Sequence, residues 1–267
     1  MLEKVSNIAV FGCGYVGGTT ADWLEAQGHS VYRIDPKLYP MTDKLEALVE
    51  CEYVVIAVPT PMNEDGTCDD SAVIDILRDE GMDYRHKILL KSTVTPDLIN
   101  NYPAQVCVAP EFLRANTARE DFENSEVLVV GHHPNNASDA DEWIELFSAL
   151  GAPVTKCSRE TASMIKYVHN AWLATKVAFF HELLNSCMNM EGFNYSDMTA
   201  TLARMKNIGP SHMIAPNQDG SLGFGGHCFP KDMRALTKMI NHRIMDEEFW
   251  VKSQYCLQYQ HMNYTIY

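Results

Sequence analysis

One cysteine of the chain, Cys228, lies in a glycine-rich segment that also contains Lys231 and Asp232. Glycines at positions 223, 225 and 226 remove side chains, so bare backbone can approach a ligand there. Both Lys231 and the N-terminus of the helix expected from Met233 onward favour a thiolate over a thiol. The segment therefore predicts an exposed nucleophilic cysteine in a loop. The structural alternative is a cysteine packed in a tight turn.

A second pair of polar side chains, Lys166 and Asn170, lies in a stretch without proline or glycine from Thr161 to about Met190. Apolar residues recur there at roughly the helical period, which predicts one helix of about 30 residues and roughly 45 Å. Lys166 and Asn170 are four residues apart and would share one face of this helix. A solvated polar pair is the alternative interpretation.

A glycine turn near the N-terminus predicts a dinucleotide site. A short apolar strand at 7–11 is followed at once by Gly12, Gly14 and Gly17, and then by a helical segment that ends near Gly28. Gly12 permits the tight turn, Gly14 lets backbone approach a pyrophosphate, and Gly17 lets the helix pack on the sheet. Free N–H groups and the dipole at the helix N-terminus would stabilise the pyrophosphate.

The next predicted strand, residues 30–34, is followed by Asp35, which lies 18 residues after Gly17. A carboxylate at this place accepts hydrogen bonds from both ribose hydroxyls and repels a 2′-phosphate. The order of strand, glycine turn, helix, strand and acid therefore predicts NAD as the cofactor in preference to NADP.

The rest of the chain divides into an alternating part and a helical part. Strands are expected at 53–58, 87–91, 105–109 and 126–131, and helices at 71–78, 96–101 and 137–150. This alternation predicts an α/β fold with a doubly wound, mostly parallel Rossmann-type sheet over residues 1–157. Residues 158–267 should form an all-helical domain built on the long central helix. Its further helices are expected at 195–205, 233–241 and 247–263.

Polar clusters follow several of the predicted strands, where ligands of such sheets bind. The clusters are Thr60, the pair Ser92 and Thr93, and the segment 110–114. Taken singly, Ser92 and Thr93 are typical of helix caps. Taken together, the clusters predict one rim of a cleft.

The composition limits the partners. The formal net charge is -14, with 35 acidic against 21 basic residues, which argues against nucleic acid or an anionic membrane surface as the main partner. The N-terminus does not resemble a signal peptide and no apolar run approaches the roughly 20 residues of a membrane span, so we expect a cytoplasmic protein. The eight cysteines form no CxxC pair, and we expect neither a metal site nor a disulfide scaffold.

Six segments in this order closely resemble the UDP-glucose/GDP-mannose 6-dehydrogenase family, and the resemblance favours UDP-glucose as the substrate. The segments are 12–17, 58–61, 91–94, 110–114, 164–170 and 223–232. Members of that family oxidise the 6-hydroxymethyl group of a nucleotide sugar to a carboxylate with two NAD⁺ in succession. The resemblance therefore implies that Cys228 carries the intermediate, first as a thiohemiacetal and then as a thioester.

The resemblance also implies roles for individual residues. Lys166 would stabilise an oxyanion beside Asn170, and Thr93 and Glu111 would hold the water that hydrolyses the thioester. The implied catalytic residues are Cys228, Lys166, Asn170, Asp232, Glu111 and Thr93. The cofactor would be bound by Gly12, Gly14, Tyr15, Val16, Gly17, Asp35, Lys37, Thr60, Thr93 and Lys231. The substrate would be bound by Glu111, Phe112, Leu113, Arg114, Lys166, Asn170, Ser221 and Gly225.

Two features depart from the family pattern. Ala115 stands where members usually carry a second glutamate, so a carboxylate that the resemblance would place near the cofactor and the catalytic water is missing. Members also continue into a second Rossmann-like domain that binds most of the nucleotide, whereas this chain stops at Tyr267. Either a dimer partner and the loop 212–220 hold the nucleotide, or a separate chain supplies that domain, or the activated sugar is a smaller or different one.

We expect a homodimer through the long helix at 161–190, because such helices often cross subunit interfaces. Two other functions stay open. A β-hydroxyacid dehydrogenase pairs a similar NAD domain with a lysine and an asparagine four residues apart, but transfers one hydride and needs no cysteine. A non-catalytic NAD-binding regulatory subunit would fit Ala115, but has no use for the combination of Cys228, Lys166 and Asp232.

Overall fold

The computed structural model describes residues 5–217, 219–226 and 228–240. The chain forms two compact units, Met1–Lys166 and Tyr167–Tyr267. The long helix α7 (Arg159–Cys187) begins in the first unit and continues through the second.

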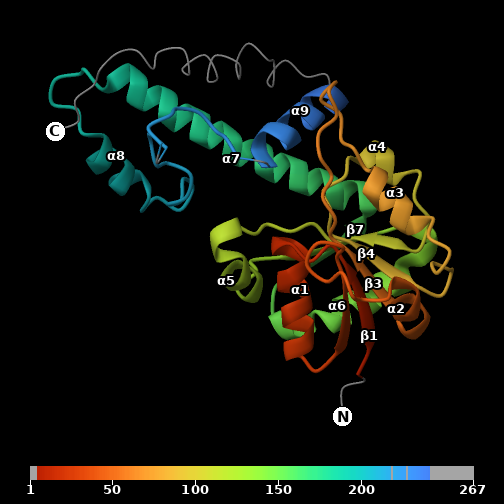
Figure 1. Cartoon of the computed structure of the whole chain (residues 1–267). Coiled ribbons are helices and arrows are strands. Elements are labelled where there is room, and N and C mark those ends of the chain that lie inside the picture. Colours follow the sequence, from red (N-terminus) through yellow and green to blue (C-terminus); the bar gives the residue numbers. More distant parts are fainter. Residues whose placement is uncertain (1–4, 218, 227, 241–267) are drawn as a thin grey trace. The chain divides into compact units, whose positions relative to one another are not determined.

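The first unit is built on a seven-stranded sheet (Figure 1). Its strands are β1 (Asn7–Phe11), β2 (Ser30–Ile34), β3 (Tyr53–Ile56), β4 (Lys87–Leu90), β5 (Val106–Val108), β6 (Leu128–His132) and β7 (Val154–Ser158). They lie in the order β2-β1-β3-β4-β5-β6-β7. All neighbours pair in parallel except β5 and β6, which are antiparallel and pair through Val108 and Gly131.

Helices cover both faces of this sheet (Figure 1), because successive strand residues point to opposite sides. On one face Ile8 and Val10 pack with α1 (Tyr15–Ala26), α5 (Ala118–Glu123) and α6 (Ala137–Leu146). An aromatic stack strengthens that layer, with the rings of Trp23 and Phe147 5.4 Å apart.

On the opposite face Ala9 and Phe11 pack with three helices and with Ala162 in the first turn of α7. These helices are α2 (Lys44–Glu50), α3 (Ser71–Leu77) and α4 (Pro96–Ile99). The doubly wound, mostly parallel sheet predicted from the sequence is confirmed.

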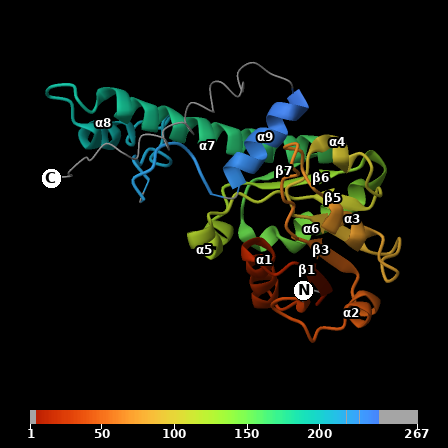
Figure 2. The ribbon, with the colours of Figure 1, turned by 45° about the horizontal axis from the view of Figure 1, so that its top comes forward.

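The described part of the second unit consists of helices and loops. Besides α7 it contains α8 (Tyr195–Leu202) and α9 (Cys228–Ile240), joined by a long loop (Figure 2). The helix predicted at 247–263 lies outside the described residues.

Several element boundaries were predicted wrongly. The helix expected from Met233 begins five residues earlier, at Cys228. Pro230 does not prevent this, because it falls in the first turn, where backbone N–H groups have no partner within the helix. The segment 137–150 is not one helix, since α6 ends at Leu146 and a 3-10 turn, Ser148–Leu150, follows. The helix expected at 195–205 ends at Leu202.

Three elements were missed, namely α2, α5 and β7. A signal for α2 was present, because the Asp43 side chain accepts a hydrogen bond from the Glu46 N–H and caps the helix. The four-residue helix α4 and the 3-10 turns Ala115–Thr117 and Pro134–Asn136 complete the first unit.

Candidate functional site

The glycine turn has the close approaches that its sequence predicts. Gly12 has a positive φ of 80° and donates its N–H to Ile34 O at 2.9 Å. A Cβ added at Gly17 would lie 1.8 Å from Gly12 O, so only glycine fits there. A Cβ at Gly14 would meet nothing within 4 Å. The turn thus leaves open space at the N-terminus of α1, as a pyrophosphate requires.

No side chain caps that helix terminus. Gly14 is the N-cap residue and Tyr15 and Val16 are the first two residues of α1, so their backbone N–H groups belong to the exposed helix end. The Tyr15 side chain is 71% exposed and does not fill the space. These features fit the dinucleotide predicted for this turn.

Asp35 is bound to the same turn through its carboxylate. One oxygen, Oδ2, accepts from the Cys13 N–H at 2.9 Å, and Oδ1 accepts from Lys37 N at 2.9 Å and Leu38 N at 3.1 Å. The Cys13 hydrogen bond is the largest of the interactions that lower the pKa of Asp35. A carboxylate offers about four acceptor sites, so Oδ2 retains capacity for a ribose hydroxyl.

Three side chains fix the segment after β4. Thr60 Oγ1 donates to Thr93 O at 2.7 Å, and Cys68 Sγ donates to the same carbonyl at 3.6 Å. Ser92 Oγ donates to Val58 O at 2.7 Å. The prediction that Ser92 and Thr93 are helix caps is wrong: the N-cap of α4 is Thr95, and it makes no side-chain cap bond. The hydroxyls of Thr60 and Ser92 instead join the segments that follow β3 and β4.

Glu111 and Lys166 form an ion pair inside the first unit. Lys166 Nζ donates to Glu111 O at 2.6 Å and to Glu111 Oε1 at 2.9 Å, while Glu111 Oε2 accepts from the Leu113 N–H at 2.6 Å. Lys166 Nζ also lies 5.7 Å from the ring centroid of Phe112. Lys166 is only 6% exposed, so the interpretation of a solvated lysine is wrong.

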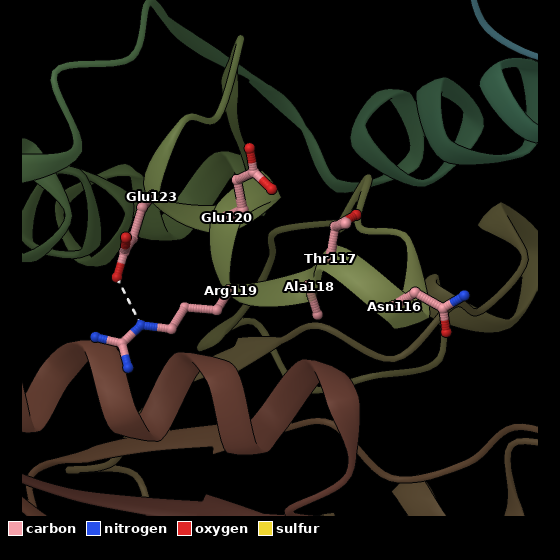
Figure 3. Close-up of a pocket in the computed structure, with 6 residues that line it drawn as sticks. All are labelled: Asn116, Thr117, Ala118, Arg119, Glu120 and Glu123. Atoms are coloured by element: carbon pink, nitrogen blue, oxygen red, sulfur yellow. Dashed lines mark hydrogen bonds and ion pairs between the residues drawn. The ribbon is translucent and has the colours of Figure 1, made fainter.

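Arg114 points to a separate partner. Its guanidinium donates to Asp121 Oδ1 at 2.6 Å, and this pair holds the pKa of the Asp121 carboxyl well below its usual range. The adjoining segment surrounds a hollow of about 350 Å³ (Figure 3), which is lined by Asn116, Thr117, Ala118, Arg119, Glu120 and Glu123. No predicted site residue lines this hollow, and we do not assign it to the reaction.

A buried lysine with no predicted role, Lys91, interacts electrostatically with Glu111 and Lys166. Lys91 is 6% exposed, and its Nζ lies 5.6 Å from the ring centroid of Phe122 and 5.9 Å from that of Phe147. The pKa of Lys91 is lowered from 10.5 to about 8, chiefly by burial; Glu111 opposes this shift and Lys166 adds to it. Its sequence signals were its position at the end of a predicted strand and its place in segment 91–94, which resembles the family.

In the second unit Cys228 is exposed and is the first residue of α9. The packed-cysteine alternative is therefore wrong. One turn later Asp232, 2% exposed, accepts from Asn170 Nδ2 at 2.6 Å through Oδ2 and from Lys231 Nζ at 2.6 Å through Oδ1. Asn170 is buried as well, so it is not a solvated side chain.

The loop before α9 contains the remaining predicted residues. Ser221 Oγ donates to Asp219 Oδ1 at 2.6 Å, and Asn217 Nδ2 donates to Ser221 Oγ at 3.0 Å and to Gly223 O at 3.0 Å. A Cβ added at Gly225 would meet nothing within 4 Å. Ser221 is thus engaged within its own turn, whereas Gly225 leaves backbone open.

Within residues 5–217, 219–226 and 228–240, every helix is too short or too polar to span a lipid bilayer. No group of three or more histidine, cysteine or acidic side chains among them could hold a metal ion.

Comparisons with known proteins agree with the resemblance. Residues 36–150 match the NAD binding domain of the UDP-glucose/GDP-mannose dehydrogenase family, and residues 160–256 match its central domain. The GDP-mannose 6-dehydrogenase of Pseudomonas aeruginosa is 28% identical over 86% of this chain and 63% of its own length. The UDP-glucose 6-dehydrogenase of Rickettsia felis is 31% identical over 89% of this chain and 62% of its own.

Solved structures of similar fold include two nucleotide-sugar dehydrogenases. A UDP-glucose dehydrogenase from Pyrobaculum islandicum has a TM-score of 0.80 at 24% identity, over 97% of this chain and 69% of that one. A GDP-mannose dehydrogenase from Pseudomonas aeruginosa, in a ternary complex, has a TM-score of 0.64 at 25% identity, over 94% of this chain and 67% of that one. The chain thus spans about 63% of the length of the curated relatives it matches.

Both family models apply to one chain, and together they cover most of it. The prediction of NAD as the cofactor is confirmed by the first of these domains. The chain belongs to the UDP-glucose/GDP-mannose dehydrogenase family.

Proposed function

We propose that this chain catalyses the NAD-dependent oxidation of the 6-hydroxymethyl group of a nucleotide sugar to the acid, with Cys228 as the covalent nucleophile. One observation carries the proposal: an exposed cysteine opens α9, a 13-residue helix, and a buried carboxylate, Asp232, follows one turn later. The N-terminus of a helix stabilises negative charge and so favours the thiolate.

Bound NAD⁺ supplies a hydride acceptor in each of the two oxidations. The glycine turn would hold its pyrophosphate, and Asp35 its ribose. Lys37, Thr60, Thr93 and Lys231 complete the proposed cofactor contacts. The Lys231 ammonium donates a hydrogen bond to Asp232. It would therefore have to contact the cofactor with another of its N–H groups.

The first oxidation removes a hydride and a proton from the alcohol and leaves an aldehyde. The Cys228 thiolate then adds to the aldehyde carbon, and the resulting oxyanion takes up a proton to give a thiohemiacetal. Loss of a second hydride and of the hydroxyl proton leaves a thioester. Lys166 is the proposed cation that stabilises these oxyanions, with Asn170 as a hydrogen-bond donor. Asn170 is already oriented by Asp232.

Water then attacks the thioester, the C–S bond breaks, and the acid and the Cys228 thiolate are released. Thr93 and Glu111 are the proposed residues that hold this water. The backbone carbonyl of Thr93 is fixed by Thr60 and Cys68, and one Glu111 oxygen is fixed by Leu113 N–H. Ala115 supplies no second carboxylate, so we expect hydrolysis to be the slowest of the steps.

UDP-glucose is the substrate that we favour. Relatives named for UDP-glucose are 30 to 31% identical to this chain, and those named for GDP-mannose 28 to 29%. The proposed sugar contacts are Glu111, Phe112, Leu113, Arg114, Lys166, Asn170, Ser221 and Gly225. The Arg114 guanidinium would have to exchange its partner Asp121 for the substrate.

We also propose a homodimer through α7. Three large apolar side chains of this helix are exposed in the single chain, with Val168, Trp172 and Phe179 54%, 61% and 60% accessible. They recur at intervals of four and seven residues and so share one face of the helix. A dimer partner, or a separate chain, would then supply nucleotide contacts. Light scattering with and without the substitution Trp172→Glu tests this directly.

Product stoichiometry tests the reaction. Purified protein with NAD⁺ and UDP-glucose should form two NADH per sugar consumed, and Cys228→Ala should stop the second NADH. GDP-mannose serves as the alternative substrate in the same assay. One NADH per sugar, unchanged in Cys228→Ser, would indicate a single-step dehydrogenase of the β-hydroxyacid type. No NADH with either sugar, despite NAD binding, would indicate a regulatory subunit.

A further inference from the structure

The loop between α8 and α9 leads directly into Cys228 and packs against the first turn of α9. The ring of Phe229, the residue after Cys228, lies 6.4 Å from the ring of Phe224 and 5.9 Å from that of His212, centroid to centroid. Both of these rings belong to the loop. The conformation of the loop therefore determines where the first turn of α9, and Cys228 with it, is placed.

A buried histidine of α7 holds this loop at two points. His181 is 2% exposed. Its Nε2 donates to Ile214 O at 2.8 Å, and its Nδ1 accepts from the Gly223 N–H at 2.8 Å. A carbonyl can only accept and an amide N–H can only donate, so the two contacts define one neutral tautomer with its hydrogen on Nε2. Burial lowers the pKa of His181 and favours this neutral form.

The two contacts lie on either side of one turn. Between Ile214 and Gly223 the chain is tied to itself, because Asn217 Nδ2 donates to Ser221 Oγ and to Gly223 O. The imidazole ring thus joins the entry and the exit of this turn to α7. Gly223 has a φ of 90°, a conformation that glycine adopts readily and other residues rarely do.

Other side chains hold the start of the loop. Lys176 Nζ donates to Ile208 O at 2.7 Å, and Tyr195 Oη donates to Met213 O at 2.7 Å. Neither reaches Gly223, from which the glycine segment leads to Cys228. His181 is the described α7 side chain that does.

We propose that His181 is a positioning residue for Cys228. Its Nδ1 accepts a hydrogen bond from the Gly223 N–H and so fixes the glycine segment before α9. The inference rests on the proposed role of Cys228 as the nucleophile. It assigns no chemical step to the imidazole ring. The Nδ1 acceptor is the essential feature, and the Nε2 donor to Ile214 is secondary.

Two conservative variants separate these contacts. In His181→Asn the amide oxygen takes the place of Nδ1 and can accept from Gly223. In His181→Gln the amide nitrogen takes the place of Nε2 and can donate to Ile214, but no acceptor remains for Gly223. The measurement is the rate of Cys228 alkylation by iodoacetamide, followed on the Cys228 peptide by mass spectrometry, together with kcat and KM for NADH formation.

We expect His181→Asn to keep the alkylation rate and kcat near those of the native chain. We expect His181→Gln to change the alkylation rate and to lower kcat by roughly 10- to 100-fold, with a smaller change in KM. Thermal unfolding and NAD affinity, measured in parallel, identify a variant that has simply lost its fold. Equal alkylation rates in both folded variants and the native chain, or equal losses in both, would overturn the proposal.

The test also separates this inference from the proposed function. If Cys228→Ala keeps both NADH per sugar, Cys228 is not the nucleophile, whatever the alkylation rates are. If Cys228→Ala forms no second NADH and His181→Gln is fully active with native alkylation, Cys228 is the nucleophile and His181 does not position it.

Discussion

The glycine turn and the long helix α7 hold candidate site residues in opposite ways. The turn works through side chains that are absent: a Cβ on Gly17 would meet Gly12 O, a Cβ on Gly12 would meet Ala57 O, and Gly14 leaves room for a ligand. The N–H groups of Gly12 and Cys13 donate to Ile34 O and to the Asp35 carboxylate, at the end of the next strand along the chain. The geometry of this region is therefore set by backbone, mostly over short distances in sequence.

Helix α7 instead works through long polar side chains that are buried. They donate to backbone carbonyls 32 to 69 residues away in sequence: Arg159 to Pro103, Ser163 to Val94, Lys166 to Glu111, Lys176 to Ile208 and His181 to Ile214. Buried carbonyls need such donors, because an unsatisfied polar group costs about 1–3 kcal/mol. Loops far apart in sequence thus depend on one helix. Substitutions in α7 should therefore affect loops that are distant from them in sequence.

The largest effect is expected in the glycine turn. Gly17→Ala would place a Cβ 1.8 Å from Gly12 O, so backbone must move, and we expect a loss of more than about 3 kcal/mol in the free energy of unfolding. Denaturant unfolding measures it. Gly14→Ala is the matched control, because its Cβ meets nothing within 4 Å. That variant should stay folded and bind NAD more weakly. Native stability in Gly17→Ala would contradict the close approach.

A buried cation that no carbonyl satisfies should behave differently from those on α7. Lys91 contacts the rings of Phe122 and Phe147, and no described group accepts a hydrogen bond from it. Its pKa is about 8 in the fold against 10.5 unfolded, chiefly because of burial. The folded chain thus binds fewer protons between these values, and its stability rises with pH across that window.

Lys91→Met should therefore stabilise the chain at pH 7 by about 1–3 kcal/mol, after allowing for lost contacts with the two rings. The advantage over the native chain should shrink as pH rises from 8 towards 10.5. Denaturant unfolding at several pH values measures this difference. A pH-independent difference would show that the Lys91 ammonium is as stable in the fold as in the unfolded chain, so that burial does not lower its pKa.

The same contrast explains what could be predicted from sequence. The glycine turn, Asp35 and the alternation of strands and helices depend on short patterns, and each was found. The pairs Lys166 with Glu111 and Asn170 with Asp232 join residues 55 and 62 positions apart. A pattern along one helix showed only that Lys166 and Asn170 share a face, and could not show which groups they meet.

Local patterns also misled where tertiary contacts decide. Ser92 has the residue type of a helix cap, but Val58 O, at the end of a neighbouring strand, takes its hydroxyl. Lys176 and His181 looked like ordinary residues of a long helix. Their roles depend on a loop whose backbone carbonyls carry no signal in the sequence.

Within the second unit, Lys176→Met should cost about 1–2 kcal/mol, because it leaves the carbonyls of Ile208 and Gly209 without their donor but also removes a buried charge. Burial lowers the pKa of Lys176, which is the reason that the two effects partly cancel. Limited proteolysis should show faster cleavage in the loop after α8. Lys206→Met, an exposed lysine near the same loop, is the control. Equal cleavage in both variants would mean that α7 does not hold this loop.

The smallest effect is expected in the first unit, for Ser163→Ala. Its hydroxyl donates to Val94 O in the segment that follows Thr93, and both residues are buried. One neutral hydrogen bond contributes about 1 kcal/mol, so we expect a modest fall in Tm. The useful readout is thioester hydrolysis, which follows both hydride transfers, since a looser Thr93 segment should slow steady-state turnover more than it slows the two NADH of the first turnover. A Tm loss with steady-state turnover unchanged would mean that this donor stabilises the fold without positioning Thr93.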